Sequence, residues 1–248
     1  MPKALSELVQ PGSAKNFDRY DKHAEENVHI LYNHGVLKFL DLPDGSTLTI
    51  SILSPLYHLS NPATFLPRKA AEKIPFSSVK LPEILNQFSV KPGSAEAGIV
   101  KEIIQTCEGE VLKGEDRYCA TSLESMVDFA MSKLGRNVQA ISTEVQKGAT
   151  LQNYTVKPGV KKMSEGDQLI VCHKMTAVFY CHTFGKSRAY VVPLRGADGT
   201  SAKAVAVCHV DTSEWNPQNF ALQVLKVKPG TVPVCHFLPQ GHIAWVPN

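Results

Sequence analysis

The chain has 248 residues, of which 43% are hydrophobic and 20% are charged, a composition typical of a folded protein with enough apolar side chains for a core. The formal net charge is only +3 and no basic run adds to it, so nothing indicates a nucleic acid partner. No apolar run reaches the roughly 18 residues of a membrane span, so we expect no membrane partner.

The N-terminal part of the chain predicts an arm, a hairpin and short helical turns. Residues 1–27 are polar without periodicity, which predicts an arm in front of a single domain at 28–248. β-rich runs surround the turn signal at residues 43–45 and predict a hairpin within residues 28–53. Four prolines then divide residues 61–90 into short helical turns.

Two longer helices are expected before the chain changes to strands. Residues 95–106 carry isoleucines at helical spacing. In the second helix, Thr121 and Glu124 fit a capping box, apolar residues follow at helical spacing, and Gly135 ends the helix. Packing against a core explains this pattern without any cofactor role.

From Val138 onwards the sequence consists of strand-like runs, many of them separated by turn signals. The predicted strands are 138–142, 152–156, 168–173, 177–182, 189–194, 204–210, 221–227, 232–237 and 243–246. We therefore expect an α+β fold that is mainly antiparallel β, with a few helices in the N-terminal half and a closed or sandwiched C-terminal sheet.

The six cysteines favour disulfides, because their number is even and no C-x-x-C spacing supports a zinc ribbon or a thioredoxin-like site. Cys107 and Cys119 are one candidate pair, which would close a short loop and stabilise the fold by about 3 kcal/mol. Asn153 begins an Asn-Tyr-Thr glycosylation acceptor, which has meaning only in a secretory compartment. The N-terminus carries no apolar signal core, which fits either a cytosolic chain or a mature or truncated secreted one. The cysteines favour the secreted alternative, so we expect an extracellular or vacuolar protein.

Each of the other four cysteines directly precedes a histidine, in Cys172-His173, Cys181-His182, Cys208-His209 and Cys235-His236. Successive side chains on a strand point to opposite faces, so neighbouring strands in matched register would gather the cysteines on one face and the histidines on the other. The cysteines could then pair as two disulfides, in any of three arrangements. The same alternation argues against a cysteine–histidine nucleophile pair, because adjacent residues face apart.

A cluster of four imidazoles disfavours protonation and suits a bound cation. With the sulfurs in disulfides, an all-imidazole set of ligands suits Cu(II), Zn(II) or Ni(II), and copper is favoured by the affinity order and by an oxidising compartment. His242, close to His236, ranks first among further ligand candidates, ahead of His58 and His34. A short stretch that follows His209 could line the site or cap a turn. Its candidate residues are Asp211, Thr212 and Trp215.

The chain resembles the plant BURP-domain family over about residues 28–248. The resemblance rests on the four dipeptides, separated by residues 174–180, 183–207 and 210–234, and on stretches such as "FLPRKAAEKIPFSSVKLPEIL" and "KPGTVPVCHFLP". The first interval is shorter than the family pattern, which predicts either a shortened hairpin loop or a changed strand register.

The resemblance implies a copper-dependent peptide cyclase that uses dioxygen to form side-chain macrocycles in a core peptide. It implies that the cysteines staple the fold and that the copper ligands and catalytic residues are His173, His182, His209 and His236. The peptide would be the N-terminal segment of this chain or a separate molecule. Residues 10–17 begin like a family core but end in Phe17, which offers neither an indole nitrogen nor a phenol oxygen.

Two other functions are compatible with the same residues. One is a non-catalytic secreted BURP protein, associated with the wall, seed or stress response, whose Cys-His elements only stabilise the fold. The other is a histidine-lined metal-binding protein without redox chemistry.

Overall fold

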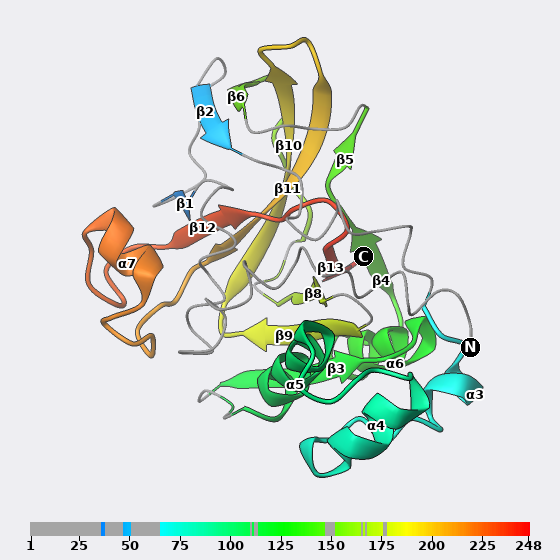
Figure 1. Cartoon of the computed structure of the whole chain (residues 1–248). Coiled ribbons are helices and arrows are strands. Elements are labelled where there is room, and N and C mark those ends of the chain that lie inside the picture. The colour runs from blue at the N-terminus through cyan, green and yellow to red at the C-terminus, as the bar shows by residue number, and fades with distance from the viewer. Residues whose placement is uncertain are drawn as a thin grey trace.

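The computed structural model describes residues 36–37, 47–50, 65–109, 111, 114–146, 152–164, 166, 168–175 and 178–248. Two antiparallel sheets form its centre, and helices α3 to α6 lie beside the smaller sheet (Figure 1). This confirms the expected α+β fold, mainly antiparallel, with a disulfide-stapled C-terminal half. The predicted arm, residues 1–27, and both His34 and His58 lie outside the described residues.

The larger sheet consists, in spatial order, of β1 (Val36–Leu37), β12 (Val234–Phe237), β11 (Ser201–His209), β10 (Ser187–Gly196), β6 (Gln152–Val156) and β2 (Thr47–Ile50). Two short strands extend it, β5 (Glu144–Val145) on β11 and β7 (Lys161–Lys162) on β10. The smaller sheet has the order β3 (Glu115–Ala120), β9 (Val178–Phe184), β8 (Ile170–Met175), β13 (Ile243–Pro247) and β4 (Val138–Ile141).

The described helices are α3 (Arg68–Ala71), the 3-10 helix η3 (Ser78–Lys80), α4 (Leu81–Gln87), α5 (Ala95–Glu108), α6 (Leu123–Leu134) and α7 (Phe220–Leu225). The short pieces at residues 68–87 confirm the expected effect of the prolines. In the part of the chain that the structure describes, no helix is long and apolar enough to cross a membrane.

The two sheets pack face to face through one apolar layer. Val205 and Val207 of the larger sheet and Leu169 and Val171 of the smaller sheet belong to this layer and are at most 3% exposed. The opposite face of the smaller sheet packs against α6, and the opposite face of the larger sheet has its own apolar cluster. Each sheet is therefore buried on both faces around its Cys-His strands, which explains their continuous apolar character.

Helix α6 begins one residue later than the sequence predicted. The hydroxyl of Ser122 accepts a hydrogen bond from the backbone nitrogen of Ser125 (3.1 Å), and the hydroxyl of Ser125 accepts one from the nitrogen of Ser122 (3.2 Å). The capping box therefore uses these two serines, and the predicted pair of Thr121 and Glu124 was wrong. Either pair satisfies the free amides of the first turn, so the sequence pattern alone does not separate them.

The predicted strand at 221–227 is wrong, because this segment forms α7. The side chain of Asn219 accepts a hydrogen bond from the nitrogen of Ala221 (2.9 Å) and caps the helix, which ends at Lys226 in a left-handed conformation. A short apolar run fits a strand and a buried helix equally well, and here the cap favours the helix. The predicted strand at 152–156 is present with the same bounds as β6, and the other predicted strands are present with shifted ends.

The predicted hairpin within residues 28–53 is also not what the described residues show. Strand β1 pairs with β12 and strand β2 pairs with β6, at opposite ends of the larger sheet. β1 and β2 are therefore the two edge strands of this sheet, and they do not pair with one another. The turn signal itself, residues 43–45, lies outside the described residues.

A disulfide that closes a longer loop should stabilise the fold more than one that closes a shorter loop. Cys208 and Cys235 are separated by 27 positions, whereas Cys172 and Cys181 are separated by 9. Replacing the first pair by alanine should lower the free energy of unfolding by about 3.5 kcal/mol, and replacing the second pair should lower it by about 2.7 kcal/mol. Guanidinium unfolding of both double variants checks the order, and a larger loss for the shorter loop would contradict the prediction.

Candidate metal site

The register of two strand pairs places the cysteines of each pair directly opposite one another. Cys172 faces Cys181 across β8 and β9, and Cys208 faces Cys235 across β11 and β12. Both pairs form disulfides with a Cα–Cα distance of 3.9 Å. Of the three arrangements that the sequence left open, the structure therefore has the one within each strand pair.

The four Cys-His strands do not lie side by side in one sheet, which corrects the expected arrangement. Two belong to the smaller sheet and two to the larger sheet. Within each strand pair, the cysteines nevertheless lie on one face of the sheet and the histidines on the other, as expected. The disulfides point into the two outer apolar clusters, whereas His173 follows Val171, and His209 follows Val207, on the faces that meet between the sheets. The imidazoles thus face one another from two sheets.

The shortened first interval shortens the hairpin and leaves the cysteines in register. Met175 pairs with Val178, so only two residues connect β8 to β9, and these lie outside the described residues. His173 is opposite Tyr180, and His182 is opposite Val171, so the two histidines are diagonal neighbours on one face. Diagonal neighbours lie within reach of long side chains.

The two histidine pairs have nearly the same geometry. The Nε2 atoms of His173 and His182 are 3.2 Å apart, and those of His209 and His236 are 3.4 Å apart. The rings of the two pairs are inclined by 28° and 27°. Two nitrogens bound to one metal ion at 2.0–2.1 Å in a tetrahedral site lie about 3.3 Å apart, which is the spacing of both pairs.

The other ring nitrogen of each histidine faces a second group. Nδ1 of His173 lies 3.0 Å from Nδ1 of His242, and Nδ1 of His209 lies 3.1 Å from the hydroxyl of Ser187. The remaining two face a backbone oxygen and a carboxylate: His236 faces Phe237 O at 3.4 Å and His182 faces Glu115 Oε1 at 3.5 Å. Metal-binding histidines typically have such a partner, which fixes the tautomer and the ring orientation.

Burial lowers the pKa of three of these imidazoles, those of His173, His209 and His236, and so favours their neutral form. His209, His236 and His242 are only 5–7% exposed. Burial, followed by the charges of its histidine neighbours, holds the pKa of His173 well below its usual value, and the same causes act on the pKa of His209. The charge of His182 also lowers the pKa of His209 and of His236, so the two pairs interact across the space between the sheets. A neutral imidazole is the form that coordinates a metal.

The side chains at this site fit a metal ion that is held by two imidazole nitrogens. All six cysteines are in disulfides, so the ligands at hand are imidazole nitrogens rather than thiolates. Within the described residues, no three His, Cys, Asp or Glu side chains converge on one point in a way that would hold a metal. The reason is visible at His173, which meets His182 through Nε2 but His242 through Nδ1. Two imidazoles per ion fit as they stand, and a larger set of ligands requires ring rotations.

The remaining predicted residues have separate roles. The ring of Trp215 lies edge-on to His209, with centroids 5.2 Å apart, and lines the site. Asp211 accepts hydrogen bonds from the nitrogen and the hydroxyl of Ser213 (3.0 and 2.7 Å), and the hydroxyl of the buried Thr212 accepts one from Gly230 (2.9 Å). These two residues therefore hold turns. Asn153 is exposed on β6.

The third disulfide, Cys107–Cys119, joins α5 to β3 and confirms that candidate pair. On the same strand, sequence analysis missed Glu115, which faces His182. No sequence signal marks this residue, because the strand that carries it is distant in sequence from the strand that it contacts.

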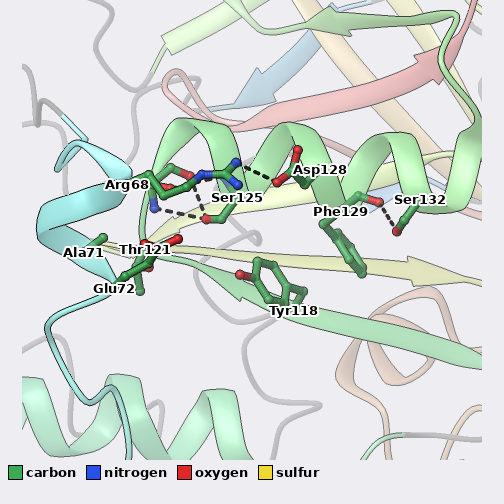
Figure 2. A pocket seen from close by; sticks show the side chains of 10 residues that line it. Arg68, Ala71, Glu72, Tyr118, Thr121, Ser125, Asp128, Phe129 and Ser132 are labelled. Carbon is green, nitrogen blue, oxygen red and sulfur yellow. Dashed lines mark hydrogen bonds and ion pairs between the residues drawn. The ribbon is translucent and has the colours of Figure 1, made fainter.

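A separate surface cavity of about 380 Å³ lies between α3, β3 and α6 (Figure 2). Tyr118 stacks on Phe129 along its wall, and Arg68 forms an ion pair with Asp128 (2.6 Å). Tyr118 points to the face of β3 opposite to Arg117, and none of the Cys-His residues lines the cavity. It is therefore distinct from the histidine cluster.

Comparison with known proteins agrees with this architecture. The BURP domain family matches residues 38–247. The chain is 56% identical over 187 residues to the BURP domain protein RD22 of Arabidopsis thaliana, which covers 73% of this chain and 47% of that protein. It is 43% identical over 190 residues to protein RAFTIN 1A of Triticum aestivum, covering 74% of this chain and 49% of that protein.

A third relative matches over its whole length. BURP domain-containing protein 6 of Oryza sativa subsp. japonica is 42% identical over 255 residues, covering 100% of both chains. By contrast, the chain spans about half the length of RD22 and of RAFTIN 1A. The family match covers nearly the whole described fold and all four Cys-His dipeptides, and the chain therefore belongs to the BURP-domain family.

Proposed function

We propose that this protein is a copper-dependent oxidative peptide cyclase, which forms side-chain macrocycles in a core peptide of ribosomal origin. The observation that supports it is the presence of two imidazole pairs between the sheets, with Nε2 atoms 3.2 Å apart in one and 3.4 Å apart in the other. When bound, copper supplies one-electron oxidation with dioxygen as co-substrate, chemistry that a closed-shell ion such as zinc does not provide.

The residues of the chain have distinct parts in this function. His173, His182, His209 and His236 hold the metal, with His242 as a further candidate beside His173. The disulfides keep the sulfurs out of the ligand set, where thiolates would favour Cu(I). Trp215 packs against His209 and bounds the site. The peptide comes from the N-terminal segment of this chain or from a separate molecule.

The compartment is consistent with this chemistry. Three disulfides indicate a protein of an oxidising, non-cytosolic compartment. We propose the secretory pathway, with the protein extracellular or vacuolar, and Asn153 on the surface of β6 is open to glycosylation there.

A second candidate is a non-catalytic secreted BURP protein with a structural or metal-binding role. The observation that favours it is that, in the described part of the chain, no three ligating side chains converge. In that case each Nε2 pair is an imidazole–imidazole hydrogen bond within the layer between the sheets.

Copper binding tests the ligand assignment. We expect the full chain to give a nitrogen-coordinated Cu(II) signal in electron paramagnetic resonance, and His209→Ala to weaken Cu(II) affinity at least about 10-fold and to change the signal. Asp211→Asn is the matched control, because Asp211 is exposed two positions from His209 and bonds only to Ser213 in the contacts described above. Full copper binding with an unchanged spectrum in His209→Ala would rule out its role as a ligand.

Mass spectrometry separates the two candidate functions. Under air with copper, a supplied peptide ending in Trp or Tyr, or the N-terminal segment of the chain, should lose two hydrogens for each crosslink formed. His209→Ala should abolish this loss. A protein that binds copper through these histidines but leaves every such peptide unchanged would support the non-catalytic alternative.

Acid should destabilise the metal-free protein. Burial lowers the pKa of His236 to about 4, whereas an imidazole in the unfolded chain titrates near about 6.5. The unfolded state therefore binds the proton first. The stabilisation is complete above the unfolded pKa and is lost as the pH falls toward the folded one, by on the order of 3 kcal/mol for this residue.

The measurement is guanidinium unfolding of metal-free protein between pH 7 and pH 4.5. His236→Gln should show a shallower loss of stability with acid, since it removes one of the buried imidazoles. Equal pH profiles for the two proteins would contradict the assignment of a depressed pKa to His236.

A further inference from the structure

We propose that Glu115 is a positioning residue, which holds His182 in the tautomer with its proton on Nδ1 and directs the bare Nε2 toward His173. The benefit of this tautomer for metal binding rests on the proposed function, whereas the contacts of Glu115 and His182 do not depend on it. Neither the Cys-His pattern nor the family match points to Glu115, because it lies on β3, far from the dipeptides in sequence.

The register of β3 places Glu115 on the histidine face of the smaller sheet. Arg117 is opposite His182, and Glu115 is two positions away on the same face, whereas Asp116 points to the other face. Asp116 pairs there with Lys133 (2.7 Å), with its side chain 54% exposed. Two adjacent carboxylates on one strand thus have entirely different surroundings.

Glu115 is a buried carboxylate that its neighbours hold in place. Its side chain is only 6% exposed, and its Oε1 accepts a hydrogen bond from the hydroxyl of Tyr180 (3.1 Å). The guanidinium of Arg117 lies 5.8 Å from the centre of the Tyr180 ring, on the same face of the strand as Glu115. Arg117 is itself anchored by the backbone oxygens of Thr106 and Gly109.

Tyr180 is a permanent donor to this carboxylate. Burial, followed by the charge of Glu115, raises the pKa of the Tyr180 hydroxyl, so it keeps its proton at any physiological pH. Because Tyr180 donates to Oε1, the carboxylate is held at the position from which the same oxygen faces His182.

The tautomer follows from what a carboxylate can do. An ionised carboxylate only accepts hydrogen bonds, so the nitrogen that faces it carries the proton. Nδ1 of His182 is 3.5 Å from Oε1, which is too long for a formed hydrogen bond. This buried nitrogen has no hydrogen-bond partner among the described residues, and Glu115 is the acidic group that it faces. With the proton on Nδ1, the lone pair of Nε2 points at His173, 3.2 Å away.

In the described part of the chain, the Nδ1 atoms of the second histidine pair face uncharged oxygens. There Nδ1 of His209 faces the hydroxyl of Ser187, and Nδ1 of His236 faces a backbone oxygen. A negative charge behind an imidazole makes it a stronger donor and balances the charge of a divalent cation. The pair of His173 and His182 is therefore the one that should bind a cation first.

A purely structural role for Glu115, in which it only satisfies Tyr180 and Arg117, leads to a different expectation. In that case the tautomer of His182 is independent of Glu115. Nitrogen-15 spectra of histidine-labelled, metal-free full chain report the tautomer directly, with the His182 signal assigned from its loss in His182→Gln.

The expected result is a proton on Nδ1 of His182 in the wild type and a shift toward the Nε2-protonated form in Glu115→Ala. Glu115→Gln keeps the volume and an accepting oxygen, so it should restore the tautomer at least in part and guards against a folding defect of the alanine variant. Asp116→Ala is the matched control and should leave the spectrum unchanged. A proton on Nε2 in the wild type, or the same tautomer in Glu115→Ala, would overturn the proposal.

Copper titration provides the second readout. Glu115→Gln should weaken the first Cu(II) equivalent by about 10- to 100-fold, since it removes the charge but not the shape, whereas Asp116→Asn should bind as the wild type does. If the wild type binds no copper while the tautomer depends on Glu115, the proposed function fails and the positioning role stands. Equal copper affinity in Glu115→Gln and the wild type would contradict the role of the carboxylate charge.

Discussion

The pleat of two short strand pairs is the constraint on which the rest of this structure depends. A disulfide between directly opposed cysteines fixes the register of a strand pair. Once the register is fixed, the residues that follow the two cysteines become diagonal neighbours on the opposite face. The chain applies this arrangement twice, once in each sheet, and both times it brings two Nε2 atoms to within 3.4 Å. The disulfide and the imidazole pair of each strand pair thus follow from the same strand register.

Stacking of the two sheets buries the imidazoles, which one strand pair alone would not do. The apolar layer between them continues from Val171 to His173 and from Val207 to His209, so the imidazoles lie next to a buried apolar layer. Desolvation there opposes protonation, and each protonated ring would also oppose protonation of its neighbours. A neutral, nitrogen-rich space between two stapled sheets follows from burial and register alone, before any metal is considered.

Sequence reasoning could predict the local parts of this arrangement. Alternation in "LIVCH" and "AVAVCH" predicts strands with sulfur on one face and imidazole on the other, and the structure has both features. It could not predict that the strands divide between two sheets, because the long intervals between the dipeptides carry no information on which strands become neighbours. Residues 221–227 show the same limit, since an apolar run this short takes its conformation from its cap and its packing. Glu115 was beyond reach for a related reason: it meets His182 only through tertiary register.

Because the disulfides lie on the face opposite to the histidines of the same strands, the arrangement of the histidines depends on whether the cysteines are oxidised. Reduction of Cys172–Cys181 or Cys208–Cys235 would free the register that keeps each imidazole pair together, although no sulfur touches an imidazole nitrogen in the contacts described above. Without the disulfides, only the backbone pairing and the apolar packing of these strands would hold the histidines opposite one another. Oxidation of the four cysteines therefore does two things: it fixes the register of each imidazole pair, and it removes the thiolates that would otherwise compete with imidazole for soft metal ions.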